Sequence, residues 1–276
     1  MASIEKGVSQ HYSAYNVLPH IREGLAATGL DPDHISPADL KAVDEFHIGG
    51  AEATAALLDD LDIGADTDVL DIGCGIGGPA RTIAQRTGAR VTGVDLTPQF
   101  VEAARALTRM AGMDGAVRFE VGSAIALPFD DGSFDTALLL HVGMNIPDKA
   151  ALFREAYRVL RRGGLFAVYD VMKTGEAGVT FPVPWAERAE LSALEPPGTY
   201  RDGAAKAGFA LDRETDRTPL ALEFFARIRA QAQSAAPAPL GLHLLLGPTI
   251  GQKMGNMIDA LRSGNIAPMQ MIFRKA

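Results

Sequence analysis

A run of glycines directly after a short apolar segment constrains this chain more than any other feature of its sequence. Residues 69–72 are apolar except for Asp71, and four glycines follow within the next six positions: Gly73, Gly75, Gly77 and Gly78. Glycine permits the positive φ of a tight turn and lets a ligand lie against bare backbone. A helix that begins there offers unpaired N–H groups and a partial positive charge. The sequence therefore predicts a buried strand, a ligand-binding turn and a helix in succession.

The spacing of these glycines fits two kinds of ligand. Gly73, Gly75 and Gly78 match the dinucleotide fingerprint, with Asp95 downstream as a ribose carboxylate, which is typical of an NAD-dependent oxidoreductase. Asp71 argues against that function, because dinucleotide-binding strands are normally apolar up to the first glycine. A carboxylate at the strand end instead suits a ligand that carries an ammonium group. The sequence favours a ligand that combines an adenosine with such a group.

The overall composition limits the classes of partner. The 276 residues carry a net charge of −8, which argues against a general nucleic-acid-binding protein because such proteins need a basic face. Cys74 is the only cysteine, so no intrachain disulfide forms and a reducing compartment is favoured. The first residues lack a signal-peptide pattern, and no apolar run reaches the ~20 residues of a membrane span. We expect a cytoplasmic protein with a small-molecule partner; its oligomeric state is not indicated.

Strand and helix patterns alternate through the middle of the chain, which is typical of a parallel sheet with helices on both faces. The predicted strands cover residues 67–72, 90–95, 116–121, 136–140, 165–170, 209–213 and 267–273. Ligands of open α/β sheets lie outside the carboxyl ends of the strands. We therefore expect one crevice to be surrounded by the polar residues at these ends, namely Asp71, Asp95, Ser123, His141 and Asp170.

Three parts are predicted: a helical N-terminal cap (residues 1–62), a core (63–218 plus 266–276) and an insertion (219–265). The cap includes a short helix near Val8–Pro19. The insertion carries a helical pattern, a Pro/Ala hinge at residues 235–239 and the apolar run Leu240–Leu246. Loops of this length are uncommon unless they are functional or have structure of their own. We predict that the insertion is a substrate lid; a helical buttress packed away from the crevice is the alternative.

The glycine-rich stretch Val69–Pro79, taken together with Val91–Leu96, resembles the cofactor-binding motifs of class I S-adenosylmethionine-dependent methyltransferases. Leu127–Asp135 and Arg161–Leu165 are similar to later motifs of that family. The resemblance implies a Rossmann-like α/β fold with a seven-stranded, mostly parallel sheet whose last strand is antiparallel. It also implies an enzyme that transfers a methyl group from S-adenosyl-L-methionine to a small-molecule acceptor.

Within the family, the chain looks most like the small-molecule branch that includes sarcosine/dimethylglycine, quinone and sterol methyltransferases. The segments His141–Lys149 and Phe181–Trp185 look most like the sarcosine/dimethylglycine group. An amine acceptor is therefore the first hypothesis, and carbon methylation of a quinone or sterol is the alternative. A cofactor-binding module without catalysis is a further alternative, although a lapsed site would tend to lose residues such as Asp71 and Asp95.

The resemblance also implies roles for individual residues at the methionine and ribose parts of the cofactor. It places Gly73 and Gly75 against the methionine part, and Asp71 near the ammonium group. It makes Asp95 the acceptor for both ribose hydroxyls.

For the adenine, the resemblance implies that Leu96 packs on the ring and that Ser123 and Ala124 lie at its edge. Many relatives have aspartate where Ser123 stands, so a weaker contact is expected there. His47 lies in a glycine-containing break between two helical stretches, which fits either a cofactor-contacting cap or an ordinary helix–helix turn.

Methyl transfer depends mainly on alignment of the acceptor and on exclusion of water. An acceptor that carries a proton also needs a base, for which histidine is suited by its pKa. His141 is the candidate base, because it follows a strand directly, and Asn145 is the candidate for orienting the substrate. The alternative is that His141 caps the next helix or only packs on the cofactor. The histidines show no metal-ligand spacing, so no metal is expected.

Overall fold

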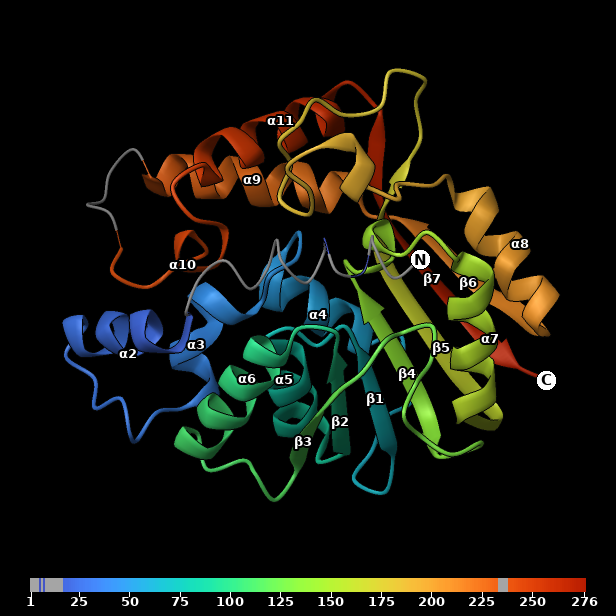
Figure 1. Cartoon of the computed structure of the whole chain (residues 1–276), viewed down its shortest axis with the longest axis horizontal. Helices are drawn as coiled ribbons and strands as arrows, with labels where there is room; N and C mark the ends of the chain where they lie inside the picture. The colour runs from blue at the N-terminus through green and yellow to red at the C-terminus, as the bar shows by residue number, and fades with distance from the viewer. Residues whose placement is uncertain (1–4, 6, 8–16, 233–237) are drawn as a thin grey trace.

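The computed structural model describes residues 5, 7, 17–232 and 238–276, and within them the chain forms a seven-stranded sheet in the order β3-β2-β1-β4-β5-β7-β6 (Figure 1). The strands are β1 (Asp68–Ile72), β2 (Arg90–Asp95), β3 (Val117–Val121), β4 (Phe134–Leu140), β5 (Leu160–Lys173), β6 (Phe209–Asp216) and β7 (Ile266–Lys275). β7 runs antiparallel to both of its neighbours, and the remaining pairs are parallel. The predicted fold class is confirmed.

The α-helices in the described ranges are α2 (Val17–Ala27), α3 (Pro37–Asp44), α4 (Gly50–Leu58), α5 (Gly78–Thr87), α6 (Pro98–Met110), α7 (Lys149–Val159), α8 (Pro197–Ala207), α9 (Thr218–Ala232), α10 (His243–Leu246) and α11 (Ile250–Arg262). Two short 3-10 helices, η1 (Gly143–Asn145) and η2 (Ala189–Leu191), lie in loops. None of the helices in these ranges has both the length and the apolar character that crossing a bilayer requires.

Alternate side chains of the central strands feed two separate cores. On β4, Ala137 and Leu139 pack with α7 and α8, whereas Leu138 and Leu140 pack with α4, α5 and α6. Parallel strands are buried on both faces, so they appear in the sequence as continuous apolar runs. This burial fixes the carboxyl ends of β1, β2 and β4 at one edge of the sheet.

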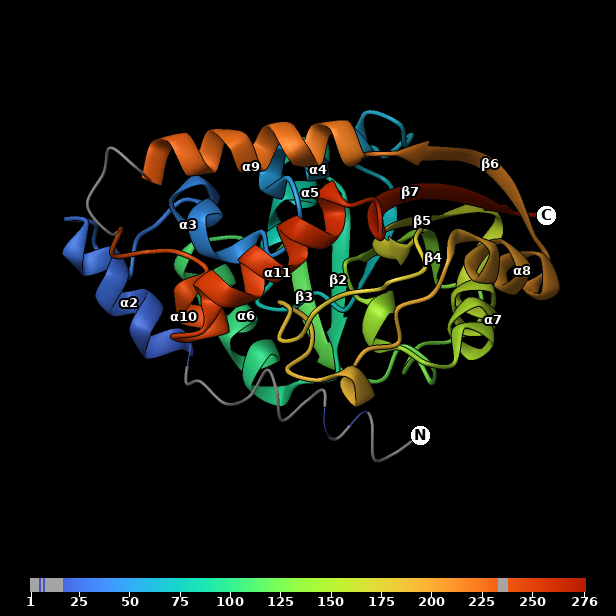
Figure 2. The same cartoon turned by 90° about the horizontal axis from the view of Figure 1, so that it is seen from above.

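The predicted cap and insertion meet beside the sheet. α10 lies next to α2 in both views, and α9 lies next to α11 (Figures 1 and 2). One apolar cluster joins α2, α3 and α10, and another joins α9 and α11 to the loop that carries Trp185. The predicted helix near Val8–Pro19 lies outside the described residues up to position 16, as does most of the hinge at 235–239.

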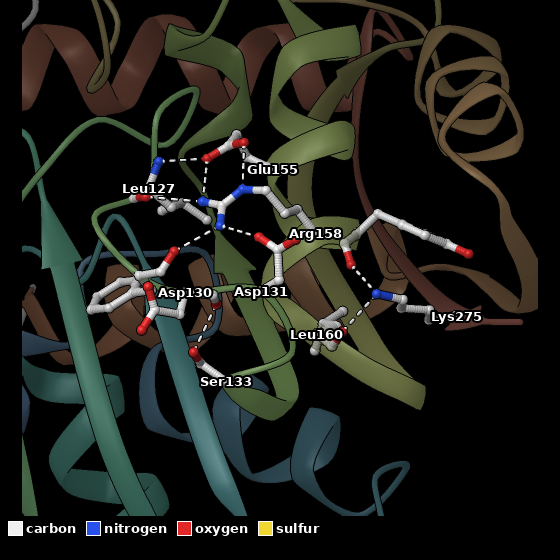
Figure 3. Close-up of polar contacts among 10 residues, drawn as sticks. Leu127, Asp130, Asp131, Ser133, Glu155, Arg158, Leu160 and Lys275 are labelled. Atoms are coloured by element: carbon white, nitrogen blue, oxygen red, sulfur yellow. Dashed lines mark hydrogen bonds and ion pairs between the residues drawn. The ribbon is translucent and has the colours of Figure 1, made fainter.

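β5 begins at Leu160, earlier than the predicted start at residue 165, because Leu160 already pairs with Phe134 before the register shifts. Arg158, in the last turn of α7, holds the loop that leads into β4 (Figure 3). Its Nη1 donates to the carbonyl of Phe129 at 2.7 Å and its Nη2 to that of Leu127 at 3.0 Å. The loop between β3 and β4, which contains Ser123, is thereby fixed to α7.

Candidate active site

A cavity opens at the carboxyl ends of β1, β2 and β4. All of the predicted site residues line it: Asp71, Gly73, Gly75, Asp95, Leu96, Ser123, Ala124, His47, His141 and Asn145. The structure thus brings together residues from four strand ends and from the N-terminal helices, while the roles assigned to them stay predictions.

Asp170, which was also expected around the crevice, does not line this cavity. Its buried carboxylate accepts hydrogen bonds from the Tyr200 hydroxyl at 2.6 Å and from the Val171 N–H at 3.0 Å. The expectation was wrong because β5 continues to Lys173, so Asp170 lies inside the strand and its side chain faces α8. Ligand-facing residues are expected only at the carboxyl end of a strand, and Asp170 lies three residues before the end of β5.

The glycine-rich turn is built as predicted, with a helix directly behind it. Gly75 has a φ of 52°, and a side chain there would meet no atom within 4 Å, so this position is open toward the cavity. Gly73 has a φ of 77°, and its missing Cβ would lie 2.3 Å from a methyl group of Val142. The turn therefore presents bare backbone to a ligand on one side and to the loop after β4 on the other.

The carboxylate of Asp95 is anchored by two backbone donors. Its Oδ2 accepts from the Gly75 N–H at 2.9 Å and its Oδ1 from the Thr97 N–H at 2.8 Å. Each carboxylate oxygen has a second lone pair, so both can still accept from a diol. Burial raises the pKa of this carboxyl, whereas the two N–H donors act to lower it.

Asp71 lies at the end of β1 and is 1% exposed. Its Oδ2 has no hydrogen-bond partner among the described residues. Burial, with the nearby charges of Glu45 and Asp95, raises the pKa of Asp71 to about 7. Since buried polar atoms are normally hydrogen-bonded, this oxygen indicates a ligand that brings a donor. The residues present thus fit a ligand with an ammonium group.

Ser123 contacts a residue that the sequence did not single out. Its hydroxyl donates to Oε1 of Glu5 at 2.6 Å, and Glu5 itself lines the cavity. The two residues are 118 positions apart, and no periodic pattern in the sequence marks such a pairing. A carboxylate therefore stands next to Ser123 at this end of the cavity, although it comes from the N-terminal segment.

Both ring nitrogens of His141 have backbone partners. Nδ1 donates to the Tyr169 carbonyl at 3.1 Å, which leaves Nε2 to accept from the Ile48 N–H at 3.3 Å. Burial and the neighbouring His47 lower the pKa of His141 to about 3. The imidazole is therefore neutral at physiological pH and has no nitrogen left for an acceptor proton. These contacts favour the packing alternative, and the general-base role stays a prediction.

Asn145 connects the loop after β4 to the loop after β5. Its Nδ2 donates to the Trp185 carbonyl at 2.8 Å. Trp185 is 2% exposed and belongs to the apolar cluster under α9 and α11, so it is a core residue and does not line the cavity. Asn145 is thus placed to hold the cavity wall.

Every charged residue among the described residues that line the cavity is acidic: Glu5, Asp44, Asp71, Asp95 and Asp148. No lysine or arginine is among them. His47 adds no positive charge to the lining, because burial lowers its pKa to about 4 and the imidazole is neutral at physiological pH. The described residues contain no group of three or more His, Cys, Asp or Glu side chains placed to hold a metal ion. The cavity therefore suits neutral or cationic groups.

Comparisons with known proteins identify the family of the chain. A family profile described as a methyltransferase domain matches residues 70–168. Methyltransferase GfsG of Streptomyces halstedii is 31% identical over 239 residues, which cover 83% of this chain and 82% of that protein. A 2-methyl-6-phytyl-1,4-hydroquinone methyltransferase of Synechocystis is 38% identical over 148 residues, which are 54% of this chain but only 45% of that protein.

A solved structure of similar fold is that of a putative sarcosine dimethylglycine methyltransferase from Galdieria sulphuraria. It has a TM-score of 0.66 at 23% identity, over 82% of this chain and 85% of that one. The fold, the cavity at the strand ends and the extended similarity to GfsG all indicate the same family. The chain belongs to the class I S-adenosylmethionine-dependent methyltransferases.

Proposed function

We propose that this enzyme methylates a small acceptor that carries no negative charge. The observation behind the proposal is the absence of lysine and arginine among the described residues that line the cavity. A carboxylate moved from water into such a site without a cationic partner loses several kcal/mol of solvation. A quinone-like or sterol-like acceptor fits this lining better than sarcosine or dimethylglycine, whose carboxylates would find no lysine or arginine among the described lining residues.

We also propose a cytoplasmic location and a small-molecule acceptor. The single cysteine, Cys74, is buried and free, which supports a cytoplasmic enzyme because reducing compartments keep thiols unpaired. The acidic lining of the cavity supports a small molecule as the acceptor, in place of nucleic acid.

The cofactor is proposed to lie along the glycine-rich turn. The residues proposed to contact it are Asp71, Gly73 and Gly75 at the methionine part, Asp95 at the ribose, and Leu96, Ser123, Ala124 and His47 around the remainder. Support comes from the unpartnered oxygen of Asp71 and from the anchored carboxylate of Asp95. The bound cofactor supplies an electrophilic methyl group on a sulfonium.

The protein's own contribution is then alignment and exclusion of water, which can lower a barrier by ~7–11 kcal/mol. Asn145 is proposed to orient the acceptor by fixing the wall formed by the loop after β4. His141 is proposed to fix the same loop against Ile48 and Tyr169. Neither role requires either residue to take a proton from the acceptor.

His141→Gln provides a direct test of that role. Glutamine also offers one donor and one acceptor, so we expect turnover to fall by less than ~10-fold and the pH–rate profile to keep its shape. A general base would instead cost ~10²–10⁴-fold and remove the acid limb of the profile. Steady-state rates across pH distinguish the two roles, with His34→Gln, an exposed histidine, as the control. Loss of the acid limb would restore the general-base hypothesis.

A panel of acceptors tests the proposed function itself. The purified enzyme is given hydroquinones, sterols, phenols, sarcosine and dimethylglycine, and release of S-adenosylhomocysteine is measured. We expect the neutral acceptors to give kcat/KM at least ~10-fold above that of the carboxylate-bearing amines, since an unpaired buried charge is so unfavourable. Highest activity with sarcosine or dimethylglycine would overturn the proposal. Binding of the cofactor without turnover of any acceptor would support the non-catalytic alternative.

A further inference from the structure

We propose that Asp44, in the last turn of α3, recognises the ammonium group of the cofactor together with Asp71. The inference rests on the cofactor position proposed above. Asp44 is 5% exposed and lines the cavity, yet nothing in the sequence pattern of α3 marks it as a site residue.

One oxygen of Asp44 is fixed and the other is unused. Oδ2 accepts from Nη2 of Arg81 at 2.9 Å, and the Arg81 guanidinium is completely buried. Oδ1 has no hydrogen-bond partner among the described residues. The Arg81 contact thus holds the carboxylate in one orientation and favours its ionised form.

The position of Asp44 at the glycine-rich turn follows from Gly78, the first residue of α5. A Cβ on Gly78 would lie 1.9 Å from the carbonyl oxygen of Asp44 and 2.8 Å from its Cγ. The end of α3 therefore presses directly on the start of α5. The turn that precedes α5 also follows Asp71 at the end of β1, so Asp44 and Asp71 both line the cavity beside this turn, and each carries an oxygen without a partner among the described residues.

Carboxylates outnumber cations around Asp44 and Asp71. Arg81 offsets one carboxylate, while Asp44 and Asp71 supply two. Glu45 also lies nearby, but its two oxygens already accept from the hydroxyls of Thr54 and Thr82. An ammonium group has three donors and one positive charge, so it could donate to an unused oxygen of each carboxylate and would reduce the excess of negative charge.

The test compares two ligands that differ only in the amino-acid part. S-adenosylhomocysteine carries the ammonium group and a carboxylate, and 5′-methylthioadenosine keeps the adenosine and thioether without either. In calorimetry, Asp44→Asn should weaken S-adenosylhomocysteine by ~10–100-fold, as expected for a lost hydrogen bond to a charged group. The Kd of methylthioadenosine should change by less than ~2-fold. Asp95→Ala is the matched control, because loss of a ribose contact should weaken both ligands alike.

A second arm needs no substitution and covers the case in which Asp44→Asn destabilises the buried Arg81. Burial raises the pKa of Asp44 to about 6 and that of Asp71 to about 7, and only the ionised carboxylates attract an ammonium group. The wild-type affinity for S-adenosylhomocysteine should therefore rise from about pH 5 to about pH 8, while that for methylthioadenosine stays flat. The groups that face these two carboxyls are Arg81, Glu45, His47 and Asp95.

The outcomes separate this inference from the proposed function. Equal weakening of both ligands by Asp44→Asn, or flat wild-type affinities together with an unaffected variant, would overturn the role of Asp44. A variant that raises only the KM of the acceptor would also overturn it. If the wild-type protein binds neither ligand, the proposed cofactor position fails instead.

Discussion

Replacing Lys149 with methionine is expected to lower the free energy of unfolding by about 3–5 kcal/mol, because each hydrogen bond donated by a charged group contributes about 1.5–3 kcal/mol. Lys149 is 4% exposed, at the start of α7. Its Nζ donates to three carbonyls, those of Gly143 at 2.8 Å, Ile146 at 2.6 Å and Ala193 at 2.9 Å. Methionine keeps the length of the side chain but removes all three of these hydrogen bonds, and only the Gly143 carbonyl has another donor among the described residues, the Ile146 N–H at 2.8 Å.

Urea unfolding of both proteins measures the difference, because the free energy varies linearly with denaturant. Lys206→Met on the exposed face of α8 is the control and should change stability by less than ~0.5 kcal/mol. A loss below about 1 kcal/mol for Lys149→Met would show that the ammonium does not hold the loop.

The pH dependence gives an independent check. Burial lowers the pKa of Lys149 from 10.5 to about 8, although Asp170 and Glu195 act to raise it. Between these values the unfolded chain binds more protons than the folded one, so this residue makes stability rise with pH. Below pH 8, Lys149 is protonated in both states, so the cost of burying its charge lowers the free energy of unfolding by its full amount. The rise between pH 8 and pH 10.5 should therefore be present in the wild type and reduced in Lys149→Met.

The centre of the fold could be predicted from the sequence because its signals are local. β2 spans Arg90–Asp95, as predicted, and its four central residues are buried, as expected for a strand covered on both faces. α5 begins at Gly78, the last of the glycines, and α6 begins at Pro98 after the N-cap Thr97, as the spacing of their apolar residues indicates. Because β1 and β2 are parallel neighbours, Asp71 and Asp95 at their carboxyl ends lie at the same edge of the sheet.

The remainder of the site depends on contacts between distant segments, which leave no pattern in the sequence. Arg81 pairs with Asp44 across 37 positions, and His141 bonds to Ile48 across 93. The pairing of Ser123 with Glu5 is longer still. Each of these contacts satisfies a buried polar group, so it is set by which helices cover the strand ends. For this reason the position of His141 was predictable, whereas the use of its two nitrogens was not.

The middle of the insertion, α10, has different contacts from the two ends, α9 and α11. α9 and α11 pack on Trp185 and Ile48 in an apolar cluster away from the cavity. α10 instead packs with Ile76 and Phe100, which line the cavity, and contributes Leu245 to the lining itself. We therefore place the proposed lid in the α10 segment and treat α9 and α11 as its support. Deleting the whole insertion would expose the Trp185 cluster and would not test the lid.

Replacing residues 240–247 with a glycine/serine linker of equal length is expected to lower kcat/KM for the acceptor by at least ~100-fold. The linker removes Leu245 from the cavity wall, together with the buried Leu240 and Leu246, so water enters and the acceptor loses its alignment. The contacts proposed for the cofactor at Asp71 and Asp95 remain, so the Kd of S-adenosylhomocysteine should change by less than ~10-fold. Leu222→Ser, at an exposed position of α9, is the control for a surface change in the insertion. A linker variant that methylates the same acceptor at the wild-type rate would show that α10 is only a buttress, as the alternative holds.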